Sequence, residues 1–534
     1  MKNRNNNFIK KTEVWVIVFF IFFAAILSFY KLATRNLWFD EAANFLVAQK
    51  IFEKPVFFIH PALYFKLLHL VIISFGQNEF FLRLFSAIFG IISIIIFYFF
   101  SRRIANKKVA FLGTFLLTLS PLRIWYSQEA SPHIMAFCLV LAAIYSFYLF
   151  INKNTFKNLF FWILFNLLSF YISSYALLLI PAQMLYFLLV RKEMAPSIKK
   201  TCLLGLLIQL LLYLPQLNNF LNSLLFVKQG FWIPPIGPNA LKYTIMNFFL
   251  GYNGTALAYN LVFTIFCLGL IYGFFQPSLK KIFRVFIAFG VFPLLTVLLL
   301  HPFIKVYLDR HNLIFMPVFF LLISASILTI SSKLVKYVGF CLLISAMICS
   351  MINYYQDIMP LSNRQRHIAG VYLKNNFTKI VTYVEKKYQS DDVLAITSPG
   401  ILTPIYFYVL GKKEIYYFFA QDDDYWTRGM SAYKPKHSLG IKFLCGDAEW
   451  GKLLFMDSPV NEELALDFLP KRIWLLQSSW SRDGTLDSNS IKIEAILRKR
   501  YFPSQQKWIE GVLVSLYTKN SLEDIHLSGS KGKE

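Results

Sequence analysis

Long apolar segments dominate the chain up to about residue 355. About 20 apolar residues are needed to cross the roughly 30 Å hydrocarbon core of a bilayer. By this measure, membrane spans are predicted near residues 13–33, 81–101, 109–124, 132–151, 158–175, 176–190, 201–220, 257–276, 285–303, 311–330 and 336–355. We interpret 13–33 as a retained signal-anchor helix, because it is long enough to cross and lacks an obvious small-residue cleavage site. The segment 60–76 is apolar but short, and it carries His60, Lys66 and His69.

The basic residues between these segments decide the predicted topology, because loops rich in Lys and Arg stay in the cytoplasm. If 60–76 lies along the membrane surface, every short basic loop faces the cytoplasm, namely those around 102–108, 153–157, 191–200, 280–284 and 333–336. If 60–76 crossed the membrane, all of them would face outward. We therefore expect a polytopic α-helical membrane protein with eleven spans, a cytoplasmic N-terminus and a juxtamembrane helix at 60–76.

The acidic residues of this part fall mostly on the opposite side. Six of the eight acids before residue 355 are predicted to face outward: Asp40, Glu41, Glu53, Glu79, Glu129 and Asp309. Glu13 and Glu193 are the exceptions. An acidic outer face is what an externally facing active site requires, and positive-inside bias also produces part of this pattern.

The tail has a different pattern, typical of a soluble α/β domain. A helix-like run, IVTYVEKKY, precedes the strand-like VLAIT, and SPGILTPIYFYVLG is predicted to start a helix. IYYFFA, RIWLLQ and VLVSLYT are further predicted strands. The sequence therefore divides into a transmembrane domain, 1–355, and an extracytoplasmic domain, 356–534.

Composition supports this division. The chain is 57% hydrophobic with a mean hydropathy of +0.52, more apolar surface than a soluble core buries. Residues 1–355 hold 30 Lys and Arg against 8 Asp and Glu, whereas the tail holds 24 against 21. The basic excess therefore lies between spans, and we expect no nucleic-acid partner. Residue usage rich in Phe, Ile, Lys and Asn suggests a bacterium, so the expected location is a bacterial inner membrane.

Two outer loops carry candidate acids. In the first, LWFDEAANF places Asp40 and Glu41 just before a helical stretch. A carboxylate there suits a general base, but acids also cap helix N-termini. In the second, SPLRIWYSQEASPHIM places Glu129 beside Gln128 and near His133. Glu129 is a candidate for positioning an acceptor, or for binding a divalent metal with the first-loop acids; the alternative is a solvated loop residue.

Two further segments offer contacts for a phosphate. HPALYFKLLH places His60, Tyr64 and Lys66 on one amphipathic helix, which is either a surface for a lipid phosphate or an interfacial helix with snorkelling cations. YLDRHNLIF puts Arg310 and His311 at the outer mouth of a span, where the planar donor fork of Arg suits phosphate. The loop 221–256, rich in Pro and Gly, is a candidate active-site flap.

No Gly-rich phosphate loop, Walker motif, HExxH or GxSxG pattern occurs in the sequence. This argues against a nucleotide-driven pump and against the common hydrolases. A lipid-linked donor needs no nucleotide-binding loop.

With these motifs, the sequence resembles bacterial members of glycosyltransferase family 39, which are GT-C-fold enzymes related to protein O-mannosyltransferases and to the lipid A aminoarabinose transferase. LWFDEA is similar to the family's first-loop acidic motif, HPALYFKLLH to its HPPLYY-type segment, and EFFLRLFSAIFG to the start of its second span. SPLRIWYSQEAS resembles the SQEAR element, and DRHNLIFMPVFFLL the RYLLPxLP span.

The resemblance implies transfer of a sugar from a polyprenyl-phosphate donor to an acceptor met outside the membrane. It implies Asp40 as catalytic base or acceptor-positioning acid with Glu41 beside it, Glu129 as second-loop acid, and Arg310 as ligand of the donor phosphate. Some relatives use a divalent metal near these acids. Three positions depart from the family pattern: Ala62 for the second Pro of HPP, Ser131 for the Arg of SQEAR, and His311 for the Tyr of RYLLP.

The sequence thus predicts an integral-membrane glycosyltransferase that acts on an extracytoplasmic protein, lipid or glycan. The alternative from another class is a transporter or flippase of a lipid-linked substrate. Transporters place ionisable residues within spans, often with internal repeats, whereas here the acids lie in loops and no repeat is visible. A third hypothesis is a non-catalytic scaffold. The acids present in both outer loops argue against it.

Overall fold

The computed structural model describes residues 11–52, 60–230, 233, 235–361, 375–409, 415–420, 441–447, 452–455, 463–464, 471–478, 486–498 and 501–519. The chain divides into two compact units. The helical unit comprises residues 1–33 and 47–371, and the sheet unit comprises residues 34–46 and 372–534. The sequence-based boundary after residue 355 falls at the end of helix α17 (Lys333–Tyr355).

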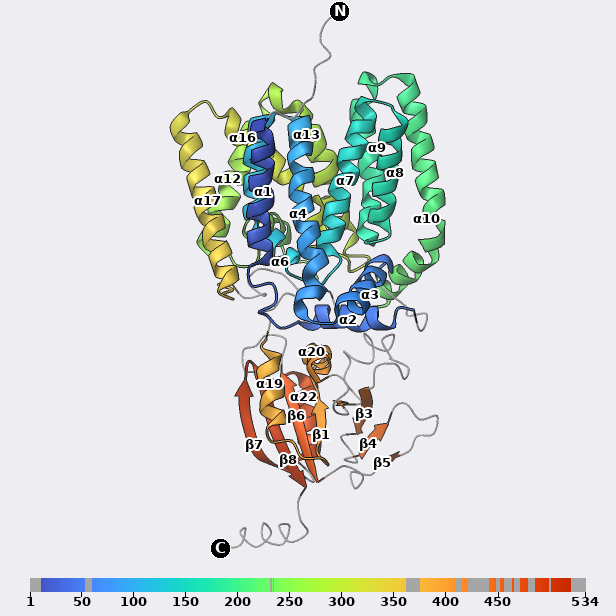
Figure 1. The fold of residues 1–534 in the computed structure, drawn as a ribbon, viewed down its shortest axis with the longest axis vertical. Helices are drawn as coiled ribbons and strands as arrows, with labels where there is room; N and C mark the ends of the chain where they lie inside the picture. The colour runs from blue at the N-terminus through green and yellow to red at the C-terminus, as the bar shows by residue number, and fades with distance from the viewer. Residues whose placement is uncertain are drawn as a thin grey trace, which may run out of the picture. The chain divides into compact units, whose positions relative to one another are not determined.

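The helical unit is a bundle of long helices that run alongside one another (Figure 1). Within the described residues, eight helical segments are long and apolar enough to cross a membrane: Thr12–Phe29, Glu79–Ile104, His133–Asn152, Ser174–Glu193, Pro196–Lys228, Ala256–Phe274, Pro277–Leu300 and Lys333–Tyr355. Two further pairs qualify when each is counted as one span bent by 60°: Lys107–Leu119 with Pro121–Ser127, and Asp309–Phe315 with Pro317–Thr329.

The main helices of this bundle, besides α17, are α1 (Lys11–Phe29), α4 (Glu79–Ile104), α5 (Lys107–Leu119), α6 (Pro121–Ser127), α7 (His133–Asn152), α8 (Phe156–Phe170), α9 (Leu179–Val190), α10 (Pro196–Gly230), α11 (Ala240–Leu250), α12 (Ala256–Phe274), α13 (Lys280–Phe286), α14 (Phe292–Leu300), α15 (Asp309–Asn312) and α16 (Pro317–Thr329). The 3₁₀ turn η1 (Ser174–Leu178) leads into α9. Polar side chains cap several N-termini; Asn78, Asn106 and Thr155 accept backbone N–H groups at the starts of α4, α5 and α8.

This arrangement confirms a polytopic helical membrane protein. Ten of the eleven predicted spans correspond to the eight long segments and the two bent pairs. The eleventh, 158–175, corresponds to α8, an apolar helix of 15 residues that is shorter than these segments. The segment 60–76 forms α3 (Leu63–Phe75), a helix of 13 residues. The predicted loop 221–256 is wrong, because it contains the end of α10 and all of α11; Phe231, Trp232 and Pro234 lie outside the described residues, as does Glu53.

Burial identifies the helices inside the bundle. In α7, 83% of the span is buried, whereas in α10 the figure is 28%. The outer face of α10 exposes leucines such as Leu203, Leu207 and Leu211. Exposed apolar side chains along a long helix require lipid.

Buried amides join three helices inside the apolar bundle. Asn166 of α8 donates to Gln183 Oε1 of α9 over 3.0 Å and to Gln209 Oε1 of α10 over 2.7 Å. Gln183 returns a bond to Asn166, and Trp162 donates to Gln183 Oε1 over 3.0 Å. All four side chains are fully buried. Such bonds hold membrane helices together where no hydrophobic driving force does.

Ion pairs join residues that were predicted to share the cytoplasmic side. Glu13 lies 3.2 Å from Arg102 and 2.7 Å from Lys107, and Glu193 lies 2.7 Å from Arg284. These contacts group both acids of the predicted inner side with basic clusters.

The sheet unit has the α/β architecture that the sequence predicts. In its described part, the strand order is β5-β4-β3-β2-β1-β6-β8-β7. Strands β1, β2, β3 and β6 run parallel, and the other neighbours are antiparallel. The strands are β1 (Val393–Ile396), β2 (Ile415–Ala420), β3 (Ile441–Asp447), β4 (Lys452–Phe455), β5 (Glu463–Leu464), β6 (Arg472–Ser478), β7 (Tyr501–Ile509) and β8 (Val512–Lys519).

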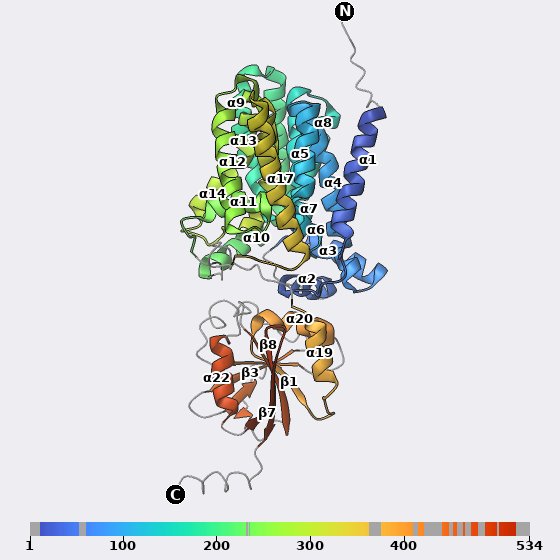
Figure 2. The same cartoon turned by 90° about the vertical axis from the view of Figure 1, so that its left-hand side faces the viewer.

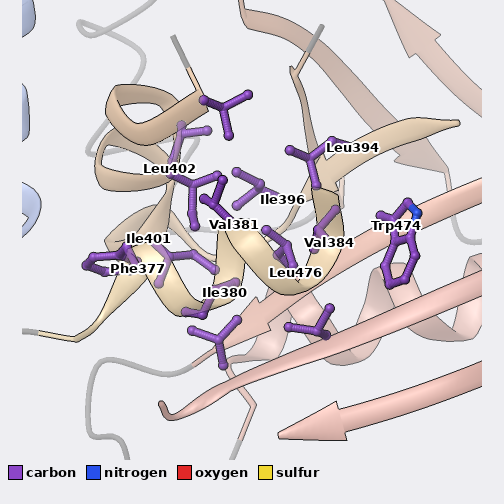
Figure 3. Packing of buried hydrophobic residues seen from close by; sticks show 14 of the residues in the cluster. Phe377, Ile380, Val381, Val384, Leu394, Ile396, Ile401, Leu402, Trp474 and Leu476 are labelled. Atoms are coloured by element: carbon purple, nitrogen blue, oxygen red, sulfur yellow. The ribbon is translucent and has the colours of Figure 1, made fainter. Parts of the chain in front are cut away.

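Helices cover both faces of this sheet. Figure 2 shows α19 (Phe377–Glu385) and α20 (Pro399–Val409) on one face and α22 (Ser488–Leu497) on the other. The core under α19 and α20 is largely aliphatic: Ile380 and Val384 of α19 and Ile401 of α20 lie in one buried cluster with Leu394 of β1 and Leu476 of β6 (Figure 3). These helices follow from the runs IVTYVEKKY and SPGILTPIYFYVLG, which were expected to be helical.

Candidate active site

A sharp break between α5 and α6 places the second-loop residues. Ser120 and Pro121 end one helix and begin the next, with Pro at the first helical position. Arg123 is fully buried and donates to the carbonyls of Leu117 (3.2 Å) and Thr118 (2.9 Å), the last residues of α5. A cation at a helix C-terminus satisfies orphan carbonyls and the helix dipole. Arg123 thus stabilises the bend between α5 and α6.

Glu129 lies directly after α6 and is fully buried. Trp125 Nε1 donates to Glu129 Oε2 over 3.0 Å. The alternative of a solvated loop residue is therefore wrong, because no part of Glu129 is exposed. The hydrogen bond from the Trp125 indole therefore fixes the orientation of the Glu129 carboxylate.

Gln128 has a structural role. Its Nε2 lies within hydrogen-bond distance of three carbonyls at the end of α1, the nearest being Tyr30 O at 2.6 Å. Its Oε1 accepts from Tyr354 of α17 over 2.7 Å. With both ends of the amide bonded to protein groups, Gln128 ties α6 to α1 and α17.

Three histidines from separate segments gather in the helical unit. His133, the first residue of α7, lies 5.6 Å from His311 of α15 between ring centroids; His60, just before α3, lies 6.2 Å from His311 and 6.5 Å from His133. The Tyr175 ring of η1 packs on His311 at 4.3 Å. Arg310 interacts electrostatically with all three imidazoles. We call His60, His133, Tyr175, Arg310 and His311 the histidine cluster.

The members of the histidine cluster differ in exposure and charge. Arg310 is buried, with 7% of its surface exposed, whereas the three imidazoles are half-buried. Burial and the charge of Arg310 lower the pKa of His60 to about 4, so His60 is neutral at pH 7. A neutral imidazole offers one N–H donor and one acceptor, and a guanidinium offers five donors in a planar fork. The cluster therefore combines a fixed positive charge with neutral hydrogen-bonding groups.

A second polar network fixes the backbone beside Arg310. Asp309 is buried; its Oδ1 accepts from the backbone N–H of Arg310 (2.8 Å) and its Oδ2 from Asn247 of α11 (2.9 Å). Tyr252 bonds Asp309 and lies 2.7 Å from the hydroxyl of Tyr126 in α6. Burial holds the pKa of Tyr252 well above its usual value, so its phenol stays a donor. Asp309 acts as an anchor for α15.

Two other candidates lie on α3. Lys66 is exposed, and its Nζ lies 6.0 Å from the ring centroid of Phe52, which fits the snorkelling alternative. Tyr64 is buried and packs on Phe65 at 5.6 Å.

The first-loop acids belong to the sheet unit. Helix α2 (Phe39–Lys50) begins just before them, and Glu41 Oε2 accepts the backbone N–H of Trp38 over 3.3 Å. This is the return bond of a capping box, in which a residue of the first turn satisfies the N-cap amide. Glu41 is fully buried, whereas Asp40 is half-buried. Glu41 therefore serves the helix start, and Asp40 is the more accessible carboxylate.

Sequence reasoning missed two members of the histidine cluster as site residues. His133 is a polar residue at the start of an apolar span, two positions after Ser131, and that was the available signal. Tyr175 offered none, because its partners Val306 and His311 are more than 130 residues away; its hydroxyl donates to Val306 O over 2.5 Å. In the part of the chain that the structure describes, no group of three or more His, Cys, Asp or Glu side chains is arranged to hold a metal ion.

Comparison with known proteins gives one family match and several similar solved structures. Residues 59–218 match the family described as dolichyl-phosphate-mannose-protein mannosyltransferase. ArnT from Cupriavidus metallidurans bound to undecaprenyl phosphate has a similar structure, with a TM-score of 0.59 and 12% identity over 94% of this chain and 98% of that one. Its apo state gives a TM-score of 0.57 and 11% identity over 95% and 98%. The chain has the GT-C fold of membrane glycosyltransferases.

The family match over residues 59–218 and the shared fold both agree with the prediction of a membrane glycosyltransferase. The matched residues 59–218 include His60, Glu129, His133 and Tyr175. A sequence comparison with curated proteins gives no match.

Proposed function

We propose that the protein transfers a sugar from a polyprenyl-phosphate-linked donor to an acceptor on the extracytoplasmic side of a bacterial inner membrane. The observation that carries the proposal is the histidine cluster, in which one buried guanidinium and three half-buried imidazoles from distant segments converge. Such a set of donors suits a phosphate. ArnT, whose fold this chain shares, was solved with undecaprenyl phosphate, which supports a lipid phosphate as its ligand.

In this proposal Arg310 receives the departing lipid phosphate, and His60, His133 and His311 add neutral hydrogen bonds. Charge develops on the phosphate oxygens as the glycosidic bond breaks, and a fixed cation there lowers the barrier. Asp40 takes the proton of the acceptor hydroxyl, and Glu129, oriented by Trp125, positions the acceptor. The sugar leaves one oxygen for another, so the reaction needs no nucleotide and no redox partner.

The proposed orientation places the N-terminus in the cytoplasm. It is supported by the positive-inside pattern and by the ion pairs of Glu13 and Glu193 with residues of the basic clusters. The acceptor is then an envelope protein, lipid or glycan.

The test is sugar transfer in membranes that contain the protein, from labelled polyprenyl-phosphate sugars into endogenous acceptors. Wild type is run beside Asp40→Asn and Glu129→Gln at matched expression. Asp357→Asn and Glu79→Gln serve as matched controls, because each removes one carboxylate of the same predicted side. We expect Asp40→Asn to lose at least ~100-fold, the contribution of a general base, and both controls to keep wild-type rates.

Three outcomes distinguish the alternatives. If Asp40→Asn and Glu129→Gln lose transfer while the controls keep it, the result supports the glycosyltransferase proposal and the roles of both acids. Wild-type rates in both variants show that these acids do not act in transfer. If wild type transfers nothing from any donor tried, the transporter alternative gains, and translocation of a labelled polyprenyl-phosphate lipid in liposomes is measured next.

A further inference from the structure

The loop that carries Asp40 is built on the sheet unit. Residues 34–46 group with residues 372–534, although the chain enters and leaves this loop through the helical unit. Its contacts with α19 and α20 span more than 340 positions of sequence. The sheet unit thus determines the local environment of the proposed catalytic base.

Before Asp40, Asn36 is hydrogen-bonded to α19 and Leu37 is hydrogen-bonded to α20. Asn36 donates to Thr378 Oγ1 over 3.0 Å and accepts the backbone N–H of Thr378 over 3.0 Å. Thr378 lies in the first turn of α19, whose amides have no partner within the helix. The backbone N–H of Leu37, a fully buried residue, donates to the phenol oxygen of Tyr408 in α20 over 2.8 Å.

On either side of Asp40, two further contacts are made with α20. Thr403 Oγ1 donates to the carbonyl of Phe39, the residue directly before Asp40, over 3.2 Å. Phe45, one turn further along α2, meets Phe407 edge-to-face with centroids 4.9 Å apart and planes at 89°. Such aromatic pairs add about 0.5–1.5 kcal/mol beyond their burial.

Three of these four contacts hold the Asp40 loop through α20, and the contact of Asn36 is with α19. Thr403 and Phe407 are four residues apart and lie on one face of α20, and Tyr408 follows Phe407 in sequence. The fifth contact is internal: Glu41 caps α2 and fixes the helix start relative to Trp38. The helix start that carries Asp40 is therefore bonded through its backbone to α20.

We propose that Thr403 and Tyr408 are positioning residues for the transfer reaction, and that the C-terminal domain orients the Asp40 loop for catalysis. This inference rests on the proposed function, because it assumes that Asp40 acts in transfer. A general base is effective only within hydrogen-bond reach of its proton, and misplacement by about 1 Å costs on the order of 100-fold.

The test measures kcat and KM of the purified full-length protein with a labelled polyprenyl-phosphate sugar. Tyr408→Phe removes the acceptor of the Leu37 amide and keeps the ring. Thr403→Val removes the donor to Phe39 and keeps the shape, whereas Thr403→Ser keeps the hydroxyl. Tyr388→Phe is the matched control, because the Tyr388 hydroxyl also bonds a backbone group of the same unit, in this case by donating to the carbonyl of Asp392.

We expect kcat to fall roughly 5- to 150-fold in Tyr408→Phe and in Thr403→Val, the range for a buried amide or carbonyl left without its partner. The KM of the lipid donor should stay within about twofold, because the histidine cluster is unchanged. Thr403→Ser should keep most of the activity, and Tyr388→Phe all of it. Equal kcat in Tyr408→Phe, Thr403→Val and wild type would overturn the inference.

A double-mutant cycle separates positioning from general destabilisation. If Tyr408 acts through Asp40, then Tyr408→Phe has less than a twofold effect in the Asp40→Asn background. If it lowers the residual rate by the same factor there, it acts on folding and the inference is wrong. If Asp40→Asn itself matches wild type, the proposed base assignment has failed, which is a separate result from unchanged rates in the α20 variants.

Discussion

Replacement of Arg310 by Gln tests the phosphate-binding role of the histidine cluster most directly. The variant keeps a side chain of similar polarity and removes the buried positive charge. Two unit charges about 4 Å apart interact by about 4 kcal/mol at an effective dielectric constant of about 20. Arg310 is 7% exposed, so water replaces little of this interaction. Loss of half to all of it, about 2–4 kcal/mol, lowers kcat/KM roughly 30- to 1,000-fold.

Two related variants, His60→Gln and Arg310→Lys, should lose less activity than Arg310→Gln. His60 is neutral at pH 7 because its pKa is lowered to about 4, so His60→Gln exchanges one neutral hydrogen-bonding group for another. Its cost should stay near 1 kcal/mol, or about fivefold. Arg310→Lys keeps the charge but loses the planar fork, and we expect about a tenfold loss.

The assay is initial-rate transfer in detergent from a labelled polyprenyl-phosphate sugar, with each variant checked for monodisperse elution. Lys305→Gln is the control, because Lys305 is an exposed cation five positions before Arg310. An Arg310→Gln enzyme within threefold of wild type would refute the reasoning. So would a loss in His60→Gln as large as that in Arg310→Gln.

Three further predictions concern stability. Arg123→Met removes a buried cation from the carbonyls that end α5. We expect the free energy of unfolding to fall by about 2–4 kcal/mol, which lowers the melting temperature in detergent; an unchanged melting temperature would contradict this. Asn166→Leu breaks the amide network of α8, α9 and α10 and should cost about 0.6–2 kcal/mol, with normal activity per folded molecule. The folded pKa of His60 lies below its ordinary value of 6.5, so neutral His60 is favoured by folding and stability is lost as pH falls from 6.5 towards 4. The loss is at most about 3 kcal/mol, and the difference in melting temperature between wild type and His60→Gln across this range should reveal it; parallel curves would show that His60 does not titrate in this way.

Local hydrophobic patterns predicted most of the fold. The spans near 13–33, 81–101 and 132–151 and the helices and strands of the tail follow from runs of apolar residues, because such runs determine burial within a segment. The same signal failed where an apolar run continues through a bend. Residues 109–124 and 311–330 were each predicted as one span, yet both are bent by 60°, before Pro121 and Pro317. Proline allows such a break without requiring it.

The candidate site was predictable only in part, because its contacts join segments far apart in sequence. Asp40, Glu129 and Arg310 were found from residue type and predicted side. Gln128 was chosen for its place beside Glu129, but it ties α1 to α17. The role of Glu41 as a helix cap was an open alternative, and the bond to Trp38 decides for it.

One departure from the family pattern lies in the histidine cluster. His311 stands where the pattern has Tyr, and its ring centroid lies 5.6 Å from that of His133. Position 131, where the SQEAR element has Arg, is a buried Ser two residues before His133. His60 beside these histidines is neutral at pH 7. A phosphate bound in the histidine cluster would therefore receive its fixed positive charge from Arg310, and the histidines would contribute directional hydrogen bonds.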